Sequence, residues 1–528
     1  MAHTIVIWWI KRDMRLLDNA ALAGACEAAR RTGASVLPLF VFDPALVESP
    51  DCSYLHLRAV LQALSGLRAA LCDVGAELAV AIGGLPELFA HPERIVGVPA
   101  RIAEIWAHEE TGLAASYQRD DQVRAWAVQQ GVRFTEVPRN GVIRRLGSRD
   151  RRIRIVEQRL TAAELAVPSS IPMAPELRKV LERHALPAAE SFGVPDPRSG
   201  IVVAGAESYA ATERSDSHRA HRAPQRVDER SAARVLESFL HHRCAAYSRG
   251  MSSPNSAPHA ASRLSVHLAW GTVSLRTVFA RTRAWAGDPA TTGTGMRSNL
   301  RSFQSRLYWH DHFVQRLEDQ PDSEFVPLNA AFGALEHNGY LPAPAAEYER
   351  RLNAWLAGTT GYPMVDATVR ALRTTGYAPF RMRAMIVSFA THVLRLWWRD
   401  VLYPMAQWMA DYVPGIHVSQ LQMQAALTGI NTIRVYNPTK QLSDHDRETT
   451  FVRRWIPELR QRSPVEIHAL PELGLAPYPS PAVDYRAESA IAKRFLYGIK
   501  NSAAGRAGAE MVMQRHGSRK RGRSTKRS

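Results

Sequence analysis

The sequence predicts a two-domain protein: an α/β N-terminal domain with a parallel, doubly wound sheet, followed by an all-helical C-terminal domain. The chain has 528 residues, which is too long for one ordinary domain and fits two large ones. Apolar, β-rich runs alternate with helix-length segments over the first third, and strand patterns largely disappear after Ala232. Hydrophobic residues make up 46% of the chain, so a sizeable core can form.

Four apolar runs predict the strands of the N-terminal domain, residues 1–140: Thr4–Trp9, Ser35–Phe42, Glu77–Ile82 and Arg101–Ala107. Helical patterns cover Ala20–Arg31, Leu55–Val74 and Gln122–Gln130. Strands separated by helix-length segments favour a parallel sheet. Such a sheet binds ligands at the carboxyl ends of its strands, so we expect a ligand of this domain at that edge.

Residues 141–234 are predicted to connect the two domains, because Glu207–Glu229 has little hydrophobic content. The second domain spans residues 235–500, with helical patterns in or beside it at Ala232–His242, Ser274–Trp285, Ser298–Leu317, Tyr348–Ala357, Pro363–Thr375, Arg381–Leu402 and Thr449–Leu459. Residues 501–528 are predicted to be a disordered basic tail, with seven Lys or Arg from Arg515 to Arg527. This tail either attracts phosphates non-specifically or has no role.

The net charge of +17 indicates a polyanionic partner, chiefly nucleic acid, because each neutralised phosphate releases a counterion. An Arg-rich proteome is the alternative explanation. The four cysteines include no CxxC pair, which argues against a disulfide framework or a metal site and favours the reducing cytoplasm. No run of eighteen apolar residues predicts a membrane span, and the N-terminus is typical of a strand rather than a signal peptide. We expect a cytoplasmic monomer.

A cluster of polar residues follows the first predicted strand: Arg12, Asp13, Arg15, Asp18 and Asn19. Any charge buried at the carboxyl end of a strand needs a partner or a ligand. We interpret the cluster as a salt-bridged loop, with Asp18 or Asn19 near the N-cap of the next helix. As a pattern, the stretch from Trp9 to Leu22 resembles the opening signature of the photolyase/cryptochrome family.

Further blocks resemble the same family, and the resemblance covers about residues 4–185 and 235–500. Gly358–Leu372 is close to the family block GxTGxPxVDAxMRxL, and its Pro363 fits the start of a helix. The sequences TG at Thr428, NP at Asn437 and FVRRWIPEL from Phe451 also match. The resemblance implies that the helical domain binds FAD and is catalytic.

The segment Ala261–Ser265 resembles the family's flavin-phosphate segment. The resemblance implies that FAD is bound by Tyr247, Ser262, Arg263, Leu264 and Ser265. Hydroxyl residues at a helix start offer donors to a pyrophosphate, although a Ser in this position is usually only a cap. The family motif usually opens with Gly-Thr where this chain has Ala260-Ala261, so one hydroxyl contact is lost.

The segment Leu307–Phe313 resembles the family's active-site helix, in which Trp309 matches the aromatic residue that stacks on the flipped lesion. The alternative is a core aromatic on an apolar helix face. Many members carry a Glu three residues before this Trp, and the position is Arg306 here. This departure bears on how the lesion is handled.

The segment Thr375–Phe389 resembles the family block TGWxxNRxRM and carries Arg381 and Arg383 on an otherwise apolar helix. A buried Arg needs a partner, and the resemblance proposes Asp411 for Arg383, beside the isoalloxazine ring. A structural salt bridge elsewhere is the alternative. Tyr377 replaces the family's usual Trp.

The resemblance also implies how a lesion would be held. A flipped dimer would enter between Trp309 and Tyr377, and Arg381, together with Arg306, would stabilise its transient negative charge. Ala384 stands where dimer-type members often carry Met and six-four types carry His, so this position does not reveal the lesion type.

The loop Asp411–Gln424 departs furthest from the family, and His417 is the nearest candidate for the Asn that meets flavin N5. Of the three Trp residues that usually relay electrons, only Trp398 aligns. A different path is open through Trp397, Tyr403, Trp408 and Tyr412. No cysteine follows Cys244, so this chain cannot hold the iron–sulfur cluster of one branch, and its closest fit is a divergent bacterial photolyase-like branch.

The resemblance implies a deoxyribodipyrimidine photo-lyase that repairs pyrimidine dimers of UV-damaged DNA, first of all the cyclobutane type, by light-driven electron transfer from reduced FAD. One alternative is a cryptochrome-type blue-light photoreceptor without repair activity. Another is a DNA-binding protein that no longer uses light. An antenna chromophore of the folate or deazaflavin type, or an empty site, is expected in the N-terminal domain near residues 108–112 and Arg119-Asp120.

Overall fold

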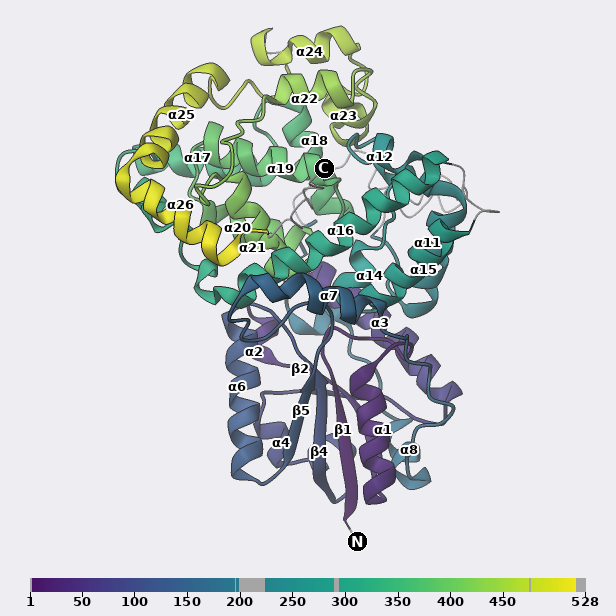
Figure 1. The fold of residues 1–528 in the computed structure, drawn as a ribbon. Helices are drawn as coiled ribbons and strands as arrows, with labels where there is room; N and C mark the ends of the chain where they lie inside the picture. Colours follow the sequence, from purple (N-terminus) through teal and green to yellow (C-terminus); the bar gives the residue numbers. More distant parts are fainter. Residues whose placement is uncertain (1, 195, 199–223, 289–293, 474–475, 519–528) are drawn as a thin grey trace, which may run out of the picture.

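The computed structural model describes residues 2–194, 196–198, 224–288, 294–473 and 476–518. The α/β domain forms the lower half of Figure 1, and the helical domain lies above it. This confirms the predicted architecture of a parallel sheet followed by helices. None of the helices in the described ranges is long and apolar enough to cross a membrane.

The N-terminal sheet has five parallel strands in the order β3-β2-β1-β4-β5. The strands are β1 (His3–Ile10), β2 (Ser35–Phe42), β3 (Ala79–Ile82), β4 (Ala100–His108) and β5 (Arg133–Val137). The strand order reverses between β1 and β4, and ligands bind at such a switch point, beyond the carboxyl ends of the strands. The fold therefore directs attention to the loops that follow β1, β2 and β4.

Seven helices of this domain connect or flank the strands: α1 (Ala20–Thr32), α2 (Pro44–Val47), α3 (Tyr54–Asp73), α4 (Glu87–Ala90), α5 (Glu93–Val96), α6 (Ala114–Gln129) and α8 (Pro175–Leu181). The Asn19 side chain accepts a hydrogen bond from the Leu22 amide (3.0 Å), which confirms the predicted N-cap of α1. The four predicted strands agree with the structure to within two residues at each end. The sequence prediction missed β5 and began α6 eight residues too late, at Gln122 instead of Ala114.

The predicted connector is partly helical, with η1 (Arg149–Arg151), α7 (Arg152–Thr161) and η2 (Ala189–Phe192) in addition to α8. Helix α7 lies where the two domains meet (Figure 1). Its Val156 and Leu160 are buried in a cluster with residues of the helical domain, which explains its fixed position. Most of the predicted polar stretch, residues 207–223, lies outside the described residues, and Glu229 already belongs to the first helix of the next domain.

The helical domain begins with α11 (Glu229–Ser238), η3 (Phe239–Arg243), η4 (Cys244–Ala246), α12 (Tyr247–Gly250), α13 (Ala257–Ala260), α14 (Ser265–Trp270), α15 (Leu275–Gly287) and α16 (Thr294–Asp319). It continues with η5 (Pro321–Glu324), η6 (Ala330–Glu336), α17 (Ala345–Ala357), α18 (Pro363–Thr375), α19 (Phe380–Ser388), η7 (Phe389–Val393), α20 (Trp398–Trp408) and α21 (Pro414–Gln424). It ends with α22 (Pro438–His445), α23 (Thr450–Trp455), η8 (Pro457–Leu459), α24 (Pro464–Leu473), α25 (Tyr485–Asn501) and α26 (Ala503–His516).

Two sequence predictions in this domain were wrong. Arg381–Leu402 is not one helix, because α19 passes into a π-helical turn (η7) and the chain then breaks at Arg395, whose φ is 54°. The predicted disordered tail begins with an ordered helix, α26, whose Val512 is 3% exposed. Residues 519–528 lie outside the described part of the chain.

Candidate active site

The polar loop after β1 joins the two domains. Asp13 is fully buried and accepts hydrogen bonds from the Lys11 amide (2.9 Å) and from His108 Nδ1 (2.8 Å). Arg15 donates from Nη1 to the Gly271 carbonyl of the helical domain (3.0 Å). Asp18 pairs with Arg276 of α15. The loop is therefore the predicted salt-bridged element, and it fixes the helical domain against the switch point of the sheet.

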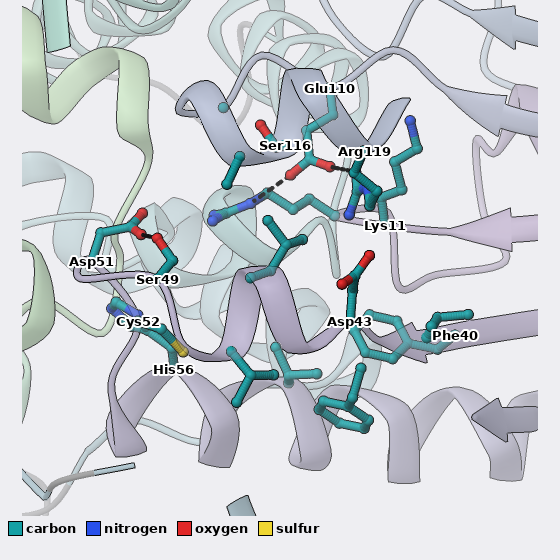
Figure 2. Close-up of a pocket in the computed structure, with 18 of the residues that line it drawn as sticks. Lys11, Phe40, Asp43, Ser49, Asp51, Cys52, His56, Glu110, Ser116 and Arg119 are labelled. Atoms are coloured by element: carbon teal, nitrogen blue, oxygen red, sulfur yellow. Dashed lines mark hydrogen bonds and ion pairs between the residues drawn. The ribbon is translucent and has the colours of Figure 1, made fainter. Parts of the chain in front are cut away.

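A cavity of about 140 Å³ lies at the carboxyl ends of β1 and β2 (Figure 2). Glu110 accepts hydrogen bonds on one side of it, from Arg12 Nε (3.2 Å) and Arg119 Nη2 (2.8 Å). Trp270 and Tyr412 of the helical domain also line it, and the Arg12 guanidinium lies over the Trp270 ring, 4.6 Å from the centroid. Of the residues predicted to line this space, Glu110, Gly112 and Arg119 do so, whereas His108 is turned toward Asp13 and Asp120 binds Lys11 (2.7 Å).

The predicted flavin-phosphate segment forms the turn before α14. Arg263 has a left-handed backbone (φ 59°), and its guanidinium lies over the Tyr377 ring, 3.5 Å from the centroid. Its Nη1 is buried and has no hydrogen-bond partner among the described residues. Ser262 and Ala261 accept hydrogen bonds through their carbonyl oxygens from Arg243. The turn thus presents a half-buried guanidinium with a free donor.

Sequence reasoning missed Arg243. Its guanidinium donates to the carbonyl oxygens of Val235 (2.8 Å), Ala261 and Ser262, so it ties the turn to the end of α11. Burial and the nearby Arg263 lower the pKa of Arg243 to about 10. The one sequence signal is the position of Arg243 shortly after the apolar pair Phe239-Leu240, in a helical segment whose polar side would ordinarily face solvent.

Arg383 and Asp411 form the predicted ion pair. Two parallel hydrogen bonds join them, Nη1 to Oδ1 (2.9 Å) and Nη2 to Oδ2 (3.0 Å), which is the strong bidentate arrangement. Burial alone would raise the pKa of Asp411, but Arg383, a hydrogen bond from Ser265 and the charge of Arg263 together hold it below its usual value. Residues from three distant segments of the sequence therefore meet at one carboxylate.

His417 faces the same space. It lines a small cavity together with Arg383 and Asp411, and it is 6% exposed. Its Nε2 lies 2.7 Å from the Leu402 carbonyl oxygen, which can only accept, so this nitrogen carries the ring hydrogen. Burial lowers the pKa of His417 to about 4, so the ring is neutral at pH 7 and its Nδ1 is an acceptor. Most of the remaining cavity wall is apolar, with Gln420 and Gln424 as further polar side chains; the apolar residues include Phe380, Ala384, Val387, Met405, Met409 and Leu421.

The predicted lesion-contacting residues divide between two places. Arg306 is exposed and hydrogen-bonds the hydroxyl of Tyr247, a buried residue whose pKa is raised by burial. Trp309, which is 38% exposed, packs on His312 (5.0 Å between centroids) and lines a separate cavity beside α7. Trp309 is thus an exposed aromatic and not the core residue that was the alternative.

Two further predicted residues have buried atoms without partners, and Leu264 is fully buried. Arg381 is half-buried, and its Nε has no hydrogen-bond partner within the described ranges. Trp398 is 1% exposed, and its Nε1 is likewise unpaired in the described structure. Its ring lies 6.2 Å from that of Trp397, which borders the surface groove at Tyr348 and Tyr403.

Comparison with known proteins identifies this constellation. The family model described as DNA photolyase matches residues 6–148, and the model described as the FAD binding domain of DNA photolyase matches residues 303–497. The chain belongs to the photolyase/cryptochrome family.

A curated member of this family, a deoxyribodipyrimidine photo-lyase of Halobacterium salinarum, is 28% identical over 92% of this chain and 98% of its own length. An archaeal photolyase from Sulfolobus tokodaii, whose structure is described as holding two FAD molecules, superposes with a TM-score of 0.71 at 22% identity, covering 94% of this chain and 99% of that one. A cryptochrome from Synechocystis superposes with a TM-score of 0.74 at 18% identity over 94% and 99% of the two chains. The structural likenesses establish the fold, and they include a photolyase and a cryptochrome.

The residues of the helical domain fit the cofactor that this family carries. A flavin dinucleotide has a negatively charged diphosphate and a planar ring. For the diphosphate, the site offers buried hydrogen-bond donors without partners among the described residues, on the guanidinium groups of Arg263 and Arg381. The cavity at Arg383, Asp411 and His417 has a mostly apolar wall for a ring. Among the described residues, no group of three or more His, Cys, Asp or Glu side chains could hold a metal ion.

Proposed function

We propose that the protein is a deoxyribodipyrimidine photo-lyase, which uses light and reduced FAD to open pyrimidine dimers in DNA. The observation that carries the proposal is the meeting of Ser265, Arg383 and Asp411 at one buried ion pair, with Arg263 and Tyr377 beside it. These residues come from three segments that the family resemblance assigns to FAD. Curated relatives named deoxyribodipyrimidine photo-lyase, 28% and 27% identical over 92% and 90% of the chain, support the same activity.

Each part of the site has a separate role in holding the cofactor. Arg263, with Ser262 and Ser265, would bind the diphosphate, because charged donors at a helix start suit phosphate oxygens. The Arg383–Asp411 pair and His417 would contact the polar edge of the flavin ring. Bound FAD supplies light absorption and the electron that breaks the cyclobutane bonds.

The protein's own side chains would hold the lesion and the charge. A dimer stacks and pairs poorly, so flipping it out of the duplex costs less than flipping normal bases. Tyr377 and the exposed Trp309 offer flat surfaces. Arg306 brings positive charge to Tyr247, Arg263 lies over the Tyr377 ring, and Arg381 would add a further positive charge. Positive charge would stabilise an anion that forms on the dimer. The net charge of +17 supports DNA as the partner.

The cavity between the domains supports an antenna chromophore. It lies at the switch point of the sheet, beyond the strand ends drawn in Figure 2. The aromatic rings of Trp9, Phe40, Trp270 and Tyr412 are among the groups that line it. Arg12 and Arg119 bring positive charge, and Glu110 accepts from both. We propose a planar chromophore of the folate or deazaflavin type here. Extraction of the purified protein followed by mass spectrometry identifies the chromophore.

The deciding experiment is repair of a defined oligonucleotide. The protein, with its flavin chemically reduced, is mixed with a single-stranded oligonucleotide that contains one cyclobutane thymine dimer, under blue light. Restored thymine, measured by chromatography, supports the proposal, and the same mixture in the dark is the control. A yellow protein that restores no thymine would contradict it.

A blue-light photoreceptor without repair is the second candidate, and Arg306 favours it. Where many repair enzymes place a carboxylate toward the dimer, this chain has a guanidinium that hydrogen-bonds Tyr247. Binding of FAD without repair, together with a light-induced change in protease sensitivity, would support the photoreceptor. Replacing Arg306 with Glu then tests whether this position alone prevents repair.

A further inference from the structure

A cavity of about 330 Å³ lies beside Trp309, between α7, α16 and the residues that follow α26. Its volume is at the lower end of the roughly 300–1,000 Å³ that is typical of ligand pockets. The residues that decide its chemistry are Arg152 and Glu157 of α7, with Tyr308, Trp309 and His312 of α16. None of the functions discussed so far accounts for the polar groups of this cavity.

Arg152 contributes unpaired donors to the cavity. It is the first residue of α7 and is 6% exposed, and its Nε and Nη2 have no hydrogen-bond partner among the described residues. Burial lowers the pKa of its guanidinium to about 10, although the charge of Asp311 opposes this shift. Leaving such a group without a partner is costly, so an acceptor is expected to occupy the cavity.

His312 contributes a second donor from a different helix. Its Nδ1 lies 3.3 Å from Arg149 Nη1, and a guanidinium can only donate, so Nδ1 accepts. The hydrogen of the neutral ring is therefore on Nε2, which is buried and without a partner in the described part of the chain. Burial, with the charges of Arg316 and Arg149, lowers the pKa of His312 to about 2, so the ring stays neutral.

The surroundings of these donors are cationic and aromatic. Arg149, already paired with Asp319 (2.7 Å), and Arg316 lie next to His312, whereas Glu157 is the one acidic residue in the cavity wall. The ten-residue helix α7 adds the partial positive charge of its N-terminus. The half-exposed Trp309 and Tyr308 provide flat surfaces. An anion joined to a planar ring matches both features.

The geometry points to a nucleotide-binding pocket in which Arg152 and His312 donate to a phosphate and the base stacks on Trp309. Phosphate contacts position a nucleic acid, and aromatic side chains stack on its bases. The phosphate belongs either to the DNA strand or to a free mononucleotide. As a contact to DNA, the pocket extends the proposed function and rests on it, because it places the strand next to the lesion site.

Binding of three probes to the full-length holoprotein in the dark tests the pocket by calorimetry: dTMP, thymidine and an undamaged single-stranded 12-mer. Wild type is expected to bind dTMP more tightly than thymidine. Arg152→Gln is expected to weaken dTMP binding at least tenfold, because charge-assisted hydrogen bonds are lost, and to leave thymidine unchanged. His312→Gln should act in the same direction, and Arg154→Gln, on the exposed side of α7, is the matched control.

The source of the phosphate follows from the 12-mer. If the 12-mer displaces dTMP and Arg152→Gln also weakens the 12-mer, the strand occupies the pocket. If only dTMP binding is weakened, the occupant is a free nucleotide. Equal binding of dTMP by Arg152→Gln and wild type, or equal binding of dTMP and thymidine by wild type, overturns the pocket. These measurements need no light, so a failure of dimer repair leaves their result unaffected.

Thermal unfolding separates a binding role from a structural one. Without ligand, Arg152→Gln is expected to melt at or above the temperature of wild type, because an unpaired buried charge is removed. With dTMP, wild type should gain stability and Arg152→Gln should not. A variant that melts lower than wild type and still gains stability from dTMP would show that Arg152 is structural.

Discussion

The ring of Tyr412 is stacked on the ring of His56, with the centroids 5.3 Å apart and the planes 11° from parallel. Tyr412 also meets His417 edge-on, at 5.6 Å. His56 and Tyr412 line the cavity between the domains, and His417 lines the cavity at Asp411. A continuous row of three rings therefore separates the two cavities.

Substitutions of Tyr412 should show how this row holds the domains together. Tyr412→Phe keeps the stacking and loses the hydrogen bond between the Tyr412 hydroxyl and Asp51, so we expect a loss of about 1 kcal/mol in the free energy of unfolding. Tyr412→Ala removes a side chain that is 1% exposed, and we expect a loss of about 3–5 kcal/mol. Urea unfolding measures both, and equal losses would show that the ring itself contributes nothing.

The Arg383–Asp411 pair should be required for both flavin content and stability. Asp411→Ala leaves a guanidinium that is 18% exposed without its partner, and we expect a loss of roughly 3 kcal/mol in the free energy of unfolding. The flavin absorbance per polypeptide should fall as well. The double variant Arg383→Met, Asp411→Leu is the control, since it removes both charges and should recover stability but not flavin. Full flavin content in Asp411→Ala would show that the pair lies away from the cofactor.

This pair could be predicted because the block that carries Arg383 resembles the family, and the resemblance proposes Asp411, 28 positions further along the chain, as its partner. The sequence could not predict the direction of the Trp309 side chain. That direction depends on how α16 packs against α7, and α7 lies in a segment that was predicted to be a connector. Strand β5 was missed because RFTEV is short and polar, and only pairing with β4 stabilises it.

Helix α26 was missed for a related reason. Its sequence is rich in Ala, Gly and charge, which is typical of a tail. In the structure Gly508 packs so closely on Asn329 that a Cβ atom there would lie 2.1 Å from Asn329 Oδ1. The helix therefore depends on a long-range contact between a glycine and the polar side chain of Asn329, and a hydrophobic pattern does not reveal such a contact.

Buried histidines should make the protein sensitive to mild acid. His417 has a pKa of about 4 in the folded protein against 6.5 as the ordinary value, so the unfolded chain binds more protons between these values. Stability is therefore complete above pH 6.5 and falls as the pH drops toward 4. For one such group the slope approaches about 1.4 kcal/mol per pH unit.

In His417→Gln the slope of the free energy of unfolding against pH should be smaller than in wild type, by the amount that corresponds to the uptake of close to one proton. Urea unfolding at several pH values from 4.5 to 7.5 measures the slope for wild type and variant. His337→Gln is the matched control, because the His337 side chain is 80% exposed, and it should leave the slope unchanged. An unchanged slope in His417→Gln would mean that the ring is protonated or solvated in the folded state.

Trp398 should carry electrons to the flavin during photoreduction. It is buried and contacts Trp397 near the surface, and it is the one relay position that aligns with the family. Trp398→Phe should slow the light-driven bleaching of oxidised flavin at 450 nm by at least tenfold, and repair by chemically reduced protein should be unaffected. Trp126→Phe, in the α/β domain, is the control. Normal bleaching in Trp398→Phe would direct attention to Trp408 and Trp355, whose rings lie 4.9 Å apart.

The C-terminal basic residues should contribute to DNA affinity through charge alone. Six Lys or Arg follow Ser518 in the sequence: Arg519, Lys520, Arg521, Arg523, Lys526 and Arg527. Each phosphate that a cation neutralises releases a counterion, so the logarithm of the binding constant falls with that of salt by about 0.9 per contact on duplex DNA. A chain that ends at Ser518 should therefore bind undamaged duplex more weakly at 50 mM salt. The slope of its log binding constant against log salt should be smaller than that of the full chain by several tenths to a few units.

The preference of the shortened chain for a dimer-containing duplex over the undamaged one should persist, because non-specific phosphate contacts carry no sequence or lesion information. Fluorescence anisotropy at four salt concentrations measures both quantities, and a full-length variant with these six residues changed to Gln separates charge from length. An unchanged slope in both variants would show that the segment does not reach the DNA.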